Sequence, residues 1–182
     1  YHFVCYGLVR TLQDRHGGIE LYCKKNNYNS VKTMYKGTGI NILLVDSDLE
    51  CNPDIQIGFT DATMTEEKFG EEFYIQASVP YENRWKYSIE HDHEPIKLDV
   101  DRFIHDDQQR GYKIELDGFR PYLTDNIFDW SYAIENAKEV HCIESSFRLM
   151  VDFLNPNGKL NLHFNKEKSF RVVPTKHNWN VI

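Results

Sequence analysis

The sequence has no excess of positive charge, no closely spaced cysteines and no long apolar run. Its 21 Lys and Arg residues against 28 Asp and Glu give a net charge of −7, which disfavours a general nucleic-acid-binding protein. The longest apolar candidate, residues 40–45, is far shorter than the roughly 20 residues that span a bilayer. No transmembrane segment is therefore expected. No basic stretch followed by an apolar one opens the chain, so nothing marks it for secretion.

The four cysteines, Cys5, Cys23, Cys51 and Cys142, are widely spaced and form no CxxC pair. This spacing argues against both a zinc ribbon and a disulfide framework. Cys23 and Cys142 stand inside apolar, strand-like segments and are expected to be buried as small hydrophobic side chains. A cytoplasmic location, where thiols stay reduced, fits these features.

Several motifs that mark common enzyme classes are also missing. The sequence contains no GxGxxG, P-loop, GxSxG or HExxH pattern. A dinucleotide oxidoreductase, a P-loop nucleotide hydrolase and a serine hydrolase of the usual kind are therefore not expected. The chain does contain enough apolar residues to form a core, since 41% of its residues are hydrophobic and 14% are aromatic.

Helix-type and strand-type patterns alternate along almost the whole chain, which predicts an α/β protein with parallel sheets covered on both faces. The run 40–45 is nearly continuously apolar, as a strand buried on both faces requires. Thr124 or Asp125 is expected to cap the helix 127–137. The expected helices are 5–12, 27–35, 66–77, 127–137 and 145–154, and the expected strands are 19–23, 40–45, 55–59, 102–105, 113–116, 139–143 and 160–164.

The stretch 80–95 is rich in charge and aromatic residues and has no regular period, so we predict a linker there. It separates an N-terminal half, 1–79, from a C-terminal half, 96–182. Each half is expected to be a small Rossmann-like unit, with the working site in a cleft between them. A Rossmann half normally opens with a strand, whereas this chain begins almost inside a helix. Either that strand is missing or the first sheet is built differently.

The first candidate site is a polar loop that directly follows a predicted strand, where ligands bind in open parallel sheets. It contains His105, Asp106, Asp107, Arg110 and Gly111. A guanidinium group can bind phosphate oxygens in a forked geometry, and a glycine lets the backbone approach a ligand. One aspartate is suited to accept a proton or to hold a ribose hydroxyl. The alternative is an ordinary turn in which aspartate and arginine pair with each other.

The second candidate site is Glu144, Ser145 and Ser146, where a predicted strand leads straight into a helix. The unpaired N–H groups and the positive dipole end of a helix N-terminus attract anions. The serine hydroxyls add donors, and Glu144 is suited to a ribose diol. The alternative is a plain N-cap serine, which stabilises a protein by about 1 kcal/mol.

Histidines supply two further candidates. In a two-half enzyme the first strand-to-helix loop faces the cleft, and His2 stands at that position. It is suited to act as a base or to contact the acceptor. The alternative is a disordered chain end. On a strand, His91 and His93 would share one face, as some metal ligands do. Their charged, proline-flanked surroundings favour a linker, so no metal site is predicted.

Segments spread over most of the chain carry a resemblance to a known family. They are 2–10, with Gly7, Val9 and Arg10, and then 23–35, 103–111, 125–129, 137–147 and 174–179. The first resembles the opening motif GDH-x-x-x-x-G-x-V-R of small bacterial and viral glycosyltransferase-like proteins. The others resemble the second strand and helix of that family and its C-terminal half. Tyr1 stands where the family has an aspartate before the histidine.

That family resembles a reduced form of the two-Rossmann (GT-B) glycosyltransferases. The resemblance implies a nucleotide-sugar donor in the C-terminal half, an acceptor in the N-terminal half and no tightly bound cofactor or metal. It implies that His2 or Asp106 is the base that acts on the acceptor. The implied donor-binding residues are Arg110, Ser145 and Ser146 for the diphosphate, Glu144 or Asp125 for the ribose or base, and His105, Asp107 and Gly111 in the same site.

The activity implied is transfer of a sugar from a nucleotide-diphosphate-sugar to a glycan or other acceptor. Two alternatives remain open from the residues. One is a non-catalytic module that binds a nucleotide or a glycan. The other is a metal-dependent hydrolase that uses His91, His93 and His105 with nearby aspartates.

Overall fold

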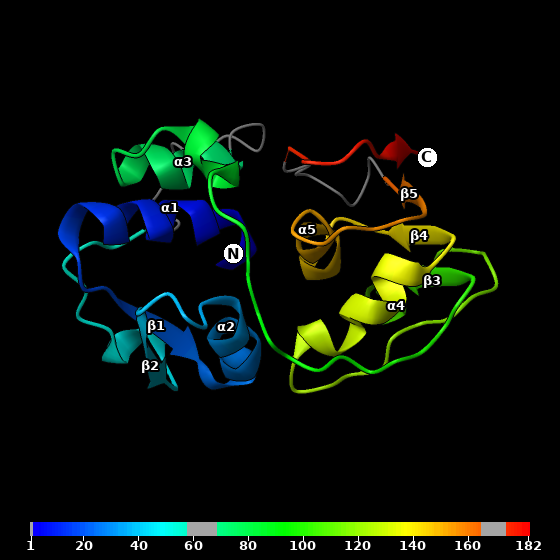
Figure 1. Cartoon of the computed structure of the whole chain (residues 1–182), viewed down its shortest axis with the longest axis horizontal. Helices are drawn as coiled ribbons and strands as arrows, with labels where there is room; N and C mark the ends of the chain where they lie inside the picture. Colours follow the sequence, from blue (N-terminus) through cyan, green and yellow to red (C-terminus); the bar gives the residue numbers. More distant parts are fainter. Residues whose placement is uncertain (1, 58–68, 165–173) are drawn as a thin grey trace. The chain divides into compact units, whose positions relative to one another are not determined.

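The computed structural model describes residues 2–57, 69–164 and 174–182. It is an α/β protein whose helices are interleaved with two parallel sheets, one of two strands and one of four (Figure 1). The chain divides into two compact units, Tyr1–Asp92 and His93–Ile182. The division falls inside the stretch 80–95, and residues 80–92 belong to the first unit. No helix of the described residues is long and apolar enough to cross a membrane.

In the first unit, strands β1 and β2 pair in parallel, with Glu20 opposite Asn41 and Lys24 opposite Val45. The first helix runs to His16, beyond the expected end at residue 12, and Gly17 follows it with a φ of 84°, a left-handed conformation that favours glycine. The elements in chain order are α1 (His2–His16), β1 (Glu20–Lys24), the 3-10 helix η1 (Lys25–Asn27), α2 (Tyr28–Met34), β2 (Asn41–Val45), η2 (Asp48–Glu50), α3 (Phe69–Gln76) and η4 (Tyr81–Trp85).

Helix α1 packs against η4 through its glycine. A Cβ atom added at Gly7 would lie 2.3 Å from the carbonyl oxygen of Asn83 and 2.7 Å from the Cα of Arg84. Leu8 and Leu12 of the same helix are buried. The close approach of two backbones therefore explains the glycine in this helix better than any need for flexibility does.

Strand β2 departs from the expectation of burial on both faces, which was wrong. Leu44 is 51% exposed, whereas its neighbour Val45 is buried. An apolar run therefore does not by itself guarantee that other elements cover both faces of a strand.

Two other predicted strands are not found. Residues 55–57 form no strand, and 58–59 lie outside the described residues, as does the predicted helix start at 66–68. Residues 113–116 are an irregular loop, in which the N–H of Ile114 donates to Asp106 and the N–H of Leu116 donates to the Ile114 carbonyl. In this loop the backbone N–H groups are satisfied by a side chain and by a nearby carbonyl, instead of by a neighbouring strand.

The second unit contains a four-stranded sheet in the order β3-β4-β5-β6, with every pair parallel. Its elements are β3 (Arg102–His105), η5 (Gln108–Arg110), η6 (Ile127–Trp130), α4 (Ser131–Asn136), β4 (Glu139–Cys142), α5 (Ser146–Val151), β5 (Lys159–Leu162) and β6 (Asn180–Val181). The helix expected over 127–137 is thus a 3-10 turn followed by α4. Its cap is Asn126, whose Oδ1 accepts the N–H of Phe128 at 3.1 Å, so the expected cap at Thr124 or Asp125 was wrong.

The two faces of the four-stranded sheet differ in chemistry. On one face Phe103 and Cys142 are fully buried, and the ring of Phe147 on α5 packs against Phe103 at 5.8 Å. The opposite face carries polar side chains, among them the buried His141 and Asn161. The predicted burial of Cys23 and Cys142 is confirmed, and all four cysteines are free thiols.

Candidate functional site

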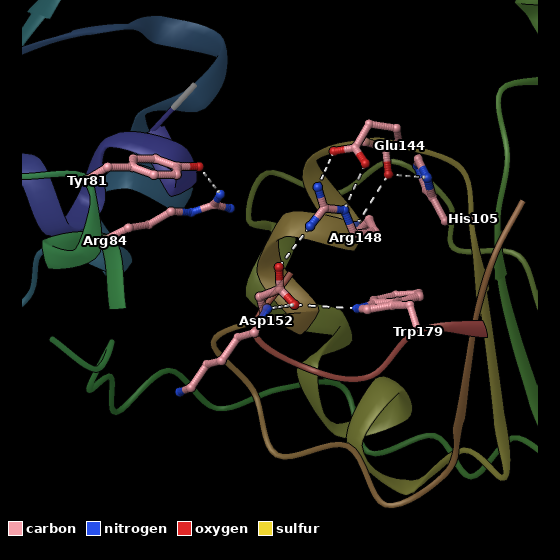
Figure 2. A network of polar contacts seen from close by, with 9 residues as sticks. Tyr81, Arg84, His105, Glu144, Arg148, Asp152 and Trp179 are labelled. Carbon is pink, nitrogen blue, oxygen red and sulfur yellow. Dashed lines mark hydrogen bonds and ion pairs between the residues drawn. The ribbon is translucent and has the colours of Figure 1, made fainter. Parts of the chain in front are cut away.

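The two loops singled out in the second half of the sequence meet at one edge of the four-stranded sheet. His105 ends β3 and lies opposite Cys142, which ends the neighbouring strand β4. The Oγ of Ser145 lies 3.1 Å from Nδ1 of His105 (Figure 2). Because carboxyl ends of parallel strands share an edge, this contact joins segments 40 residues apart at the position where such sheets bind ligands.

His105 is an uncharged imidazole at neutral pH. Burial lowers its pKa to about 4, although the nearby carboxylates of Asp106 and Asp107 oppose that shift. The ring of Phe147 stacks on it with a centroid distance of 4.3 Å. Ser145 already accepts the backbone N–H of Arg148, so we assign its hydroxyl proton to Nδ1 of His105. The Nε2 atom of His105 then carries the ring proton and is a hydrogen-bond donor.

Ser145 is the N-cap of α5, as its alternative interpretation proposed. Its neighbour Ser146 is the first residue of the helix and is exposed. Ser145 is thus engaged as the cap, and the exposed hydroxyl of Ser146 is the one that can contact a ligand at this strand-to-helix junction.

Glu144 is engaged by a buried arginine. Arg148 is fully buried and binds both carboxylate oxygens of Glu144, one of them through Nε at 3.1 Å. Its Nη1 lies 2.8 Å from Oδ2 of Asp152, which is also fully buried. The second oxygen of Asp152 accepts the N–H of Lys176 and the indole N–H of Trp179 (Figure 2). Arg148 was not among the candidate residues, although acidic residues stand four positions before and four positions after it in the sequence.

Asp106 orders its own loop. Its Oδ2 accepts the N–H of Ile114 at 3.0 Å and lies 3.1 Å from Nε of Arg120. Arg120 also donates to the carbonyl oxygens of Ile114 and Leu116. With its side chain only 5% exposed, Asp106 acts here as a structural acceptor. Arg120 was missed because it is separated by 14 residues from its partner.

Asp107 and Arg110 belong to one tight turn. An oxygen of Asp107 accepts the backbone N–H of Arg110 at 3.3 Å, and the two side chains form a 3.5 Å ion pair. Gly111 ends η5 with a φ of 78°, so this glycine serves the turn geometry. The Arg110 side chain is 81% exposed, which leaves its guanidinium group accessible to a ligand.

The two remaining candidates are Asp125 and His2. Asp125 is exposed in the loop before η6, and its carboxylate has no hydrogen bond or ion pair within the described part of the chain. His2 is the first residue of α1 in the other unit. Burial lowers the pKa of His2 to about 4, so its imidazole is unprotonated at neutral pH.

The histidines considered as metal ligands belong to different units. His91 lines a cavity of about 620 Å³ in the first unit, together with Arg10 and Tyr87. In the second unit, His93 lies 2.6 Å from Asp129. Within residues 2–57, 69–164 and 174–182, no three His, Cys, Asp or Glu side chains form a group that could hold a metal ion.

A cavity of about 760 Å³, which no sequence pattern indicated, lies at the opposite end of the strands of the four-stranded sheet. Arg102, Glu139 and Lys159, which begin three of the strands, line it. Arg102 and Glu139 form a 2.7 Å ion pair there. The cavity is thus at the amino ends of the strands, away from the contact between His105 and Ser145.

Comparison of the chain with protein-family models, curated proteins and solved structures gives no match. The class that the fold itself defines is a two-unit α/β protein built on parallel sheets.

Proposed function

We propose that this chain is a glycosyltransferase that moves a sugar from a nucleotide-diphosphate-sugar to a glycan or other acceptor. In this proposal the two units correspond to the reduced GT-B architecture that the sequence resembles. The observation that carries it is the hydrogen bond between Ser145 and His105. It supports the proposal because it joins two polar loops, each of which follows a strand, at the carboxyl ends of the strands. Open parallel sheets bind their ligands at that end.

The diphosphate would bind beside this hydrogen bond. The N–H of His105 Nε2 and the hydroxyl of Ser146 would donate to its oxygens. Arg110 would add positive charge, since its guanidinium is exposed and, among the described residues, is engaged by one long ion pair, to Asp107. Such donors stabilise the negative charge that develops on a leaving diphosphate without a metal ion. Asp125 would accept hydrogen bonds from the ribose hydroxyls, because its carboxylate is exposed.

The general base would be His2. Its imidazole is unprotonated at neutral pH, because burial lowers its pKa to about 4, and its ring nitrogens can therefore accept a hydrogen bond from an acceptor hydroxyl. Asp106 is the weaker candidate, since its carboxylate already accepts from Ile114 and Arg120. Deprotonation of an acceptor hydroxyl by His2 would accompany attack on the anomeric carbon, while the diphosphate leaves with the electron pair of the bond that breaks.

Isothermal titration calorimetry of the full chain with UDP-, GDP- and ADP-sugars tests the proposal. We expect one nucleotide class to bind in preference to the others, with competition by the corresponding nucleoside diphosphate. The absence of binding to all three classes would overturn the proposal.

The second candidate function is a non-catalytic module that binds a nucleotide sugar. It is favoured by the engagement of Asp106 with Arg120 and of Glu144 with Arg148, which occupies one carboxylate considered as the base and one considered for donor binding. Donor hydrolysis or sugar transfer that is lost in both His2→Ala and Arg110→Ala would eliminate this candidate.

A further inference from the structure

Arg84 is a buried guanidinium group that lacks an acidic partner. It lies in η4 and is 1% exposed. Its Nη1 donates to the hydroxyl of Tyr81 at 2.8 Å (Figure 2), and its charge lies 4.3 Å from the ring centroid of Trp85. No carboxylate of the described residues forms an ion pair with it, and its Nε and Nη2 atoms have no hydrogen-bond partner.

This arrangement is unusual for a charged side chain. A guanidinium group keeps its charge at every ordinary pH, and buried charges in proteins are normally paired. The ring of Trp85 and the hydroxyl of Tyr81 offset only part of the desolvation. Arg148 in the other unit shows the usual solution, since it is equally buried but binds the carboxylates of Glu144 and Asp152.

The two unused donors lie on the same edge of the guanidinium plane. In arginine, the N–H groups of Nε and Nη2 point in parallel, in the fork that matches two oxygens of a carboxylate or phosphate. We propose that Arg84 is the anchor of an anion-binding site in the first unit, which takes a carboxylate or phosphate group through these two donors. The shared requirement is a pair of oxygens on one charged group.

The surroundings of Arg84 favour such a ligand. Its charge acts on Cys5 and Tyr74, where it partly opposes the larger effect of burial, which raises the pKa of Cys5 to about 12. These neighbours are therefore neutral at ordinary pH, and they do not compete with an incoming anion for the guanidinium. A hydrogen bond to a charged group is stronger where water is excluded. Because the donor atoms are buried, entry of the anion requires a local displacement of the side chains that cover them.

Thermal unfolding of the full chain tests this site. Inorganic phosphate and acetate are each compared with chloride at the same ionic strength and pH. All proteins carry Arg110→Ala, so that the candidate donor site cannot contribute and the two proposals can fail separately. Arg84→Met and Arg84→Lys are compared with Arg15→Met, which removes an exposed arginine of the same unit.

We expect phosphate, acetate or both to raise the melting temperature by several degrees in the two proteins that retain Arg84. These are the Arg110→Ala protein without a further change and the one that also carries Arg15→Met. The shift should vanish in Arg84→Met and shrink in Arg84→Lys, because lysine lacks the fork. A response to only one of the two anions identifies the charged group. An equal shift in Arg84→Met, or no shift with either anion in the Arg84 protein, would overturn the proposal.

A second readout does not depend on the stability of the methionine variant. In protein labelled with ¹⁵N-arginine, the Nε–H signal that is absent from Arg84→Lys should move when the stabilising anion is added. A signal that stays in place at saturating phosphate and acetate would contradict direct binding by Arg84.

Discussion

The Nδ1 atom of His141 lies 2.8 Å from the Nε2 atom of His163, on the polar face of the four-stranded sheet. Two imidazoles form such a hydrogen bond only while one of them supplies an acceptor, so protonation of both breaks it. Burial lowers the pKa of each ring, and the neighbouring His141 lowers that of His163 further. The pair therefore favours the folded state only while it carries at most one positive charge.

The first prediction concerns acid stability. Groups whose pKa is lower in the folded than in the unfolded state contribute stability that is present above the unfolded value, near 6.5, and lost as the pH falls. His141 and His163 should begin this loss below about pH 6.5, and His105 and His2 should extend it to about pH 4. We expect a decrease of a few kcal/mol in the free energy of unfolding, measured by urea titration from pH 7.5 to pH 4.5.

The contribution of the histidine pair can be separated from general acid unfolding. His163→Gln should show a shallower pH dependence than the unmodified chain. His16→Gln, which changes an exposed histidine, should retain the full dependence. Identical slopes in the two variants would contradict the assignment to the pair.

The second prediction concerns the contact of Gly7 with η4. Gly7→Ala places a Cβ within 2.3 Å of a backbone oxygen, so α1 and η4 must separate. We expect a loss of about 1–3 kcal/mol in the free energy of unfolding, as for other overpacked sites. Gly18→Ala is the matched control, since nothing lies within 4 Å of the added Cβ. If Gly7→Ala is as stable as Gly18→Ala, the two backbones are not in close contact.

The third prediction compares a buried with a half-exposed ion pair. Arg148→Met leaves Glu144 and the fully buried Asp152 without their shared cation, which should cost about 3–5 kcal/mol in urea unfolding. Arg102→Met removes a pair with Glu139 in which both side chains are 34% exposed, and it should cost less than about 1 kcal/mol. Comparable losses in the two variants would show that Arg148 does not hold this network together.

The fourth prediction follows from the proposed donor site. Arg110→Ala should weaken binding of the preferred nucleotide-diphosphate-sugar about tenfold in calorimetry, because an exposed charge-assisted contact to phosphate is lost. Lys113→Ala removes another exposed cation of the same loop, which pairs with Glu115 at 2.7 Å. It should leave the dissociation constant within about twofold, so an equal effect of both variants would indicate general electrostatic attraction only.

The fifth prediction separates the base from the donor site. His2→Ala should lower the rate of sugar transfer by about 10²–10⁴-fold, the usual contribution of a general base, without changing donor affinity. Rates and dissociation constants measured on the same preparation test both parts. Transfer at an unchanged rate would remove His2 from the mechanism.

Local sequence patterns predicted the order of helices and strands well, because periodicity reports which side of a segment is buried. The helix stop at Gly17 and the burial of Cys142 follow from such local signals. The failures arose where neighbours mattered. Residues 113–116 have a strand-like composition, but the N–H of Ile114 donates to Asp106. This N–H is therefore not available to a neighbouring strand.

For the candidate site, the sequence identified the loops but not the contacts of their side chains. Ser145 and His105 stand at strand ends, which the pattern could locate. Their hydrogen bond depends on β3 and β4 being adjacent and in register. The pairing of Asp106 with Arg120 could not be predicted either, because no local sequence pattern links these two residues.

By itself, then, the sequence determined an alternating α/β protein with polar loops after its strands, since alternation and loop position are local properties. The tertiary structure decided which polar groups are satisfied. It pairs Arg148 with two carboxylates and leaves two donors of Arg84 unpaired, although both arginines are buried. The physical reason is that the partner of a buried charge depends on which segments the fold brings together, and that depends on strand order and register rather than on neighbouring residues in the chain.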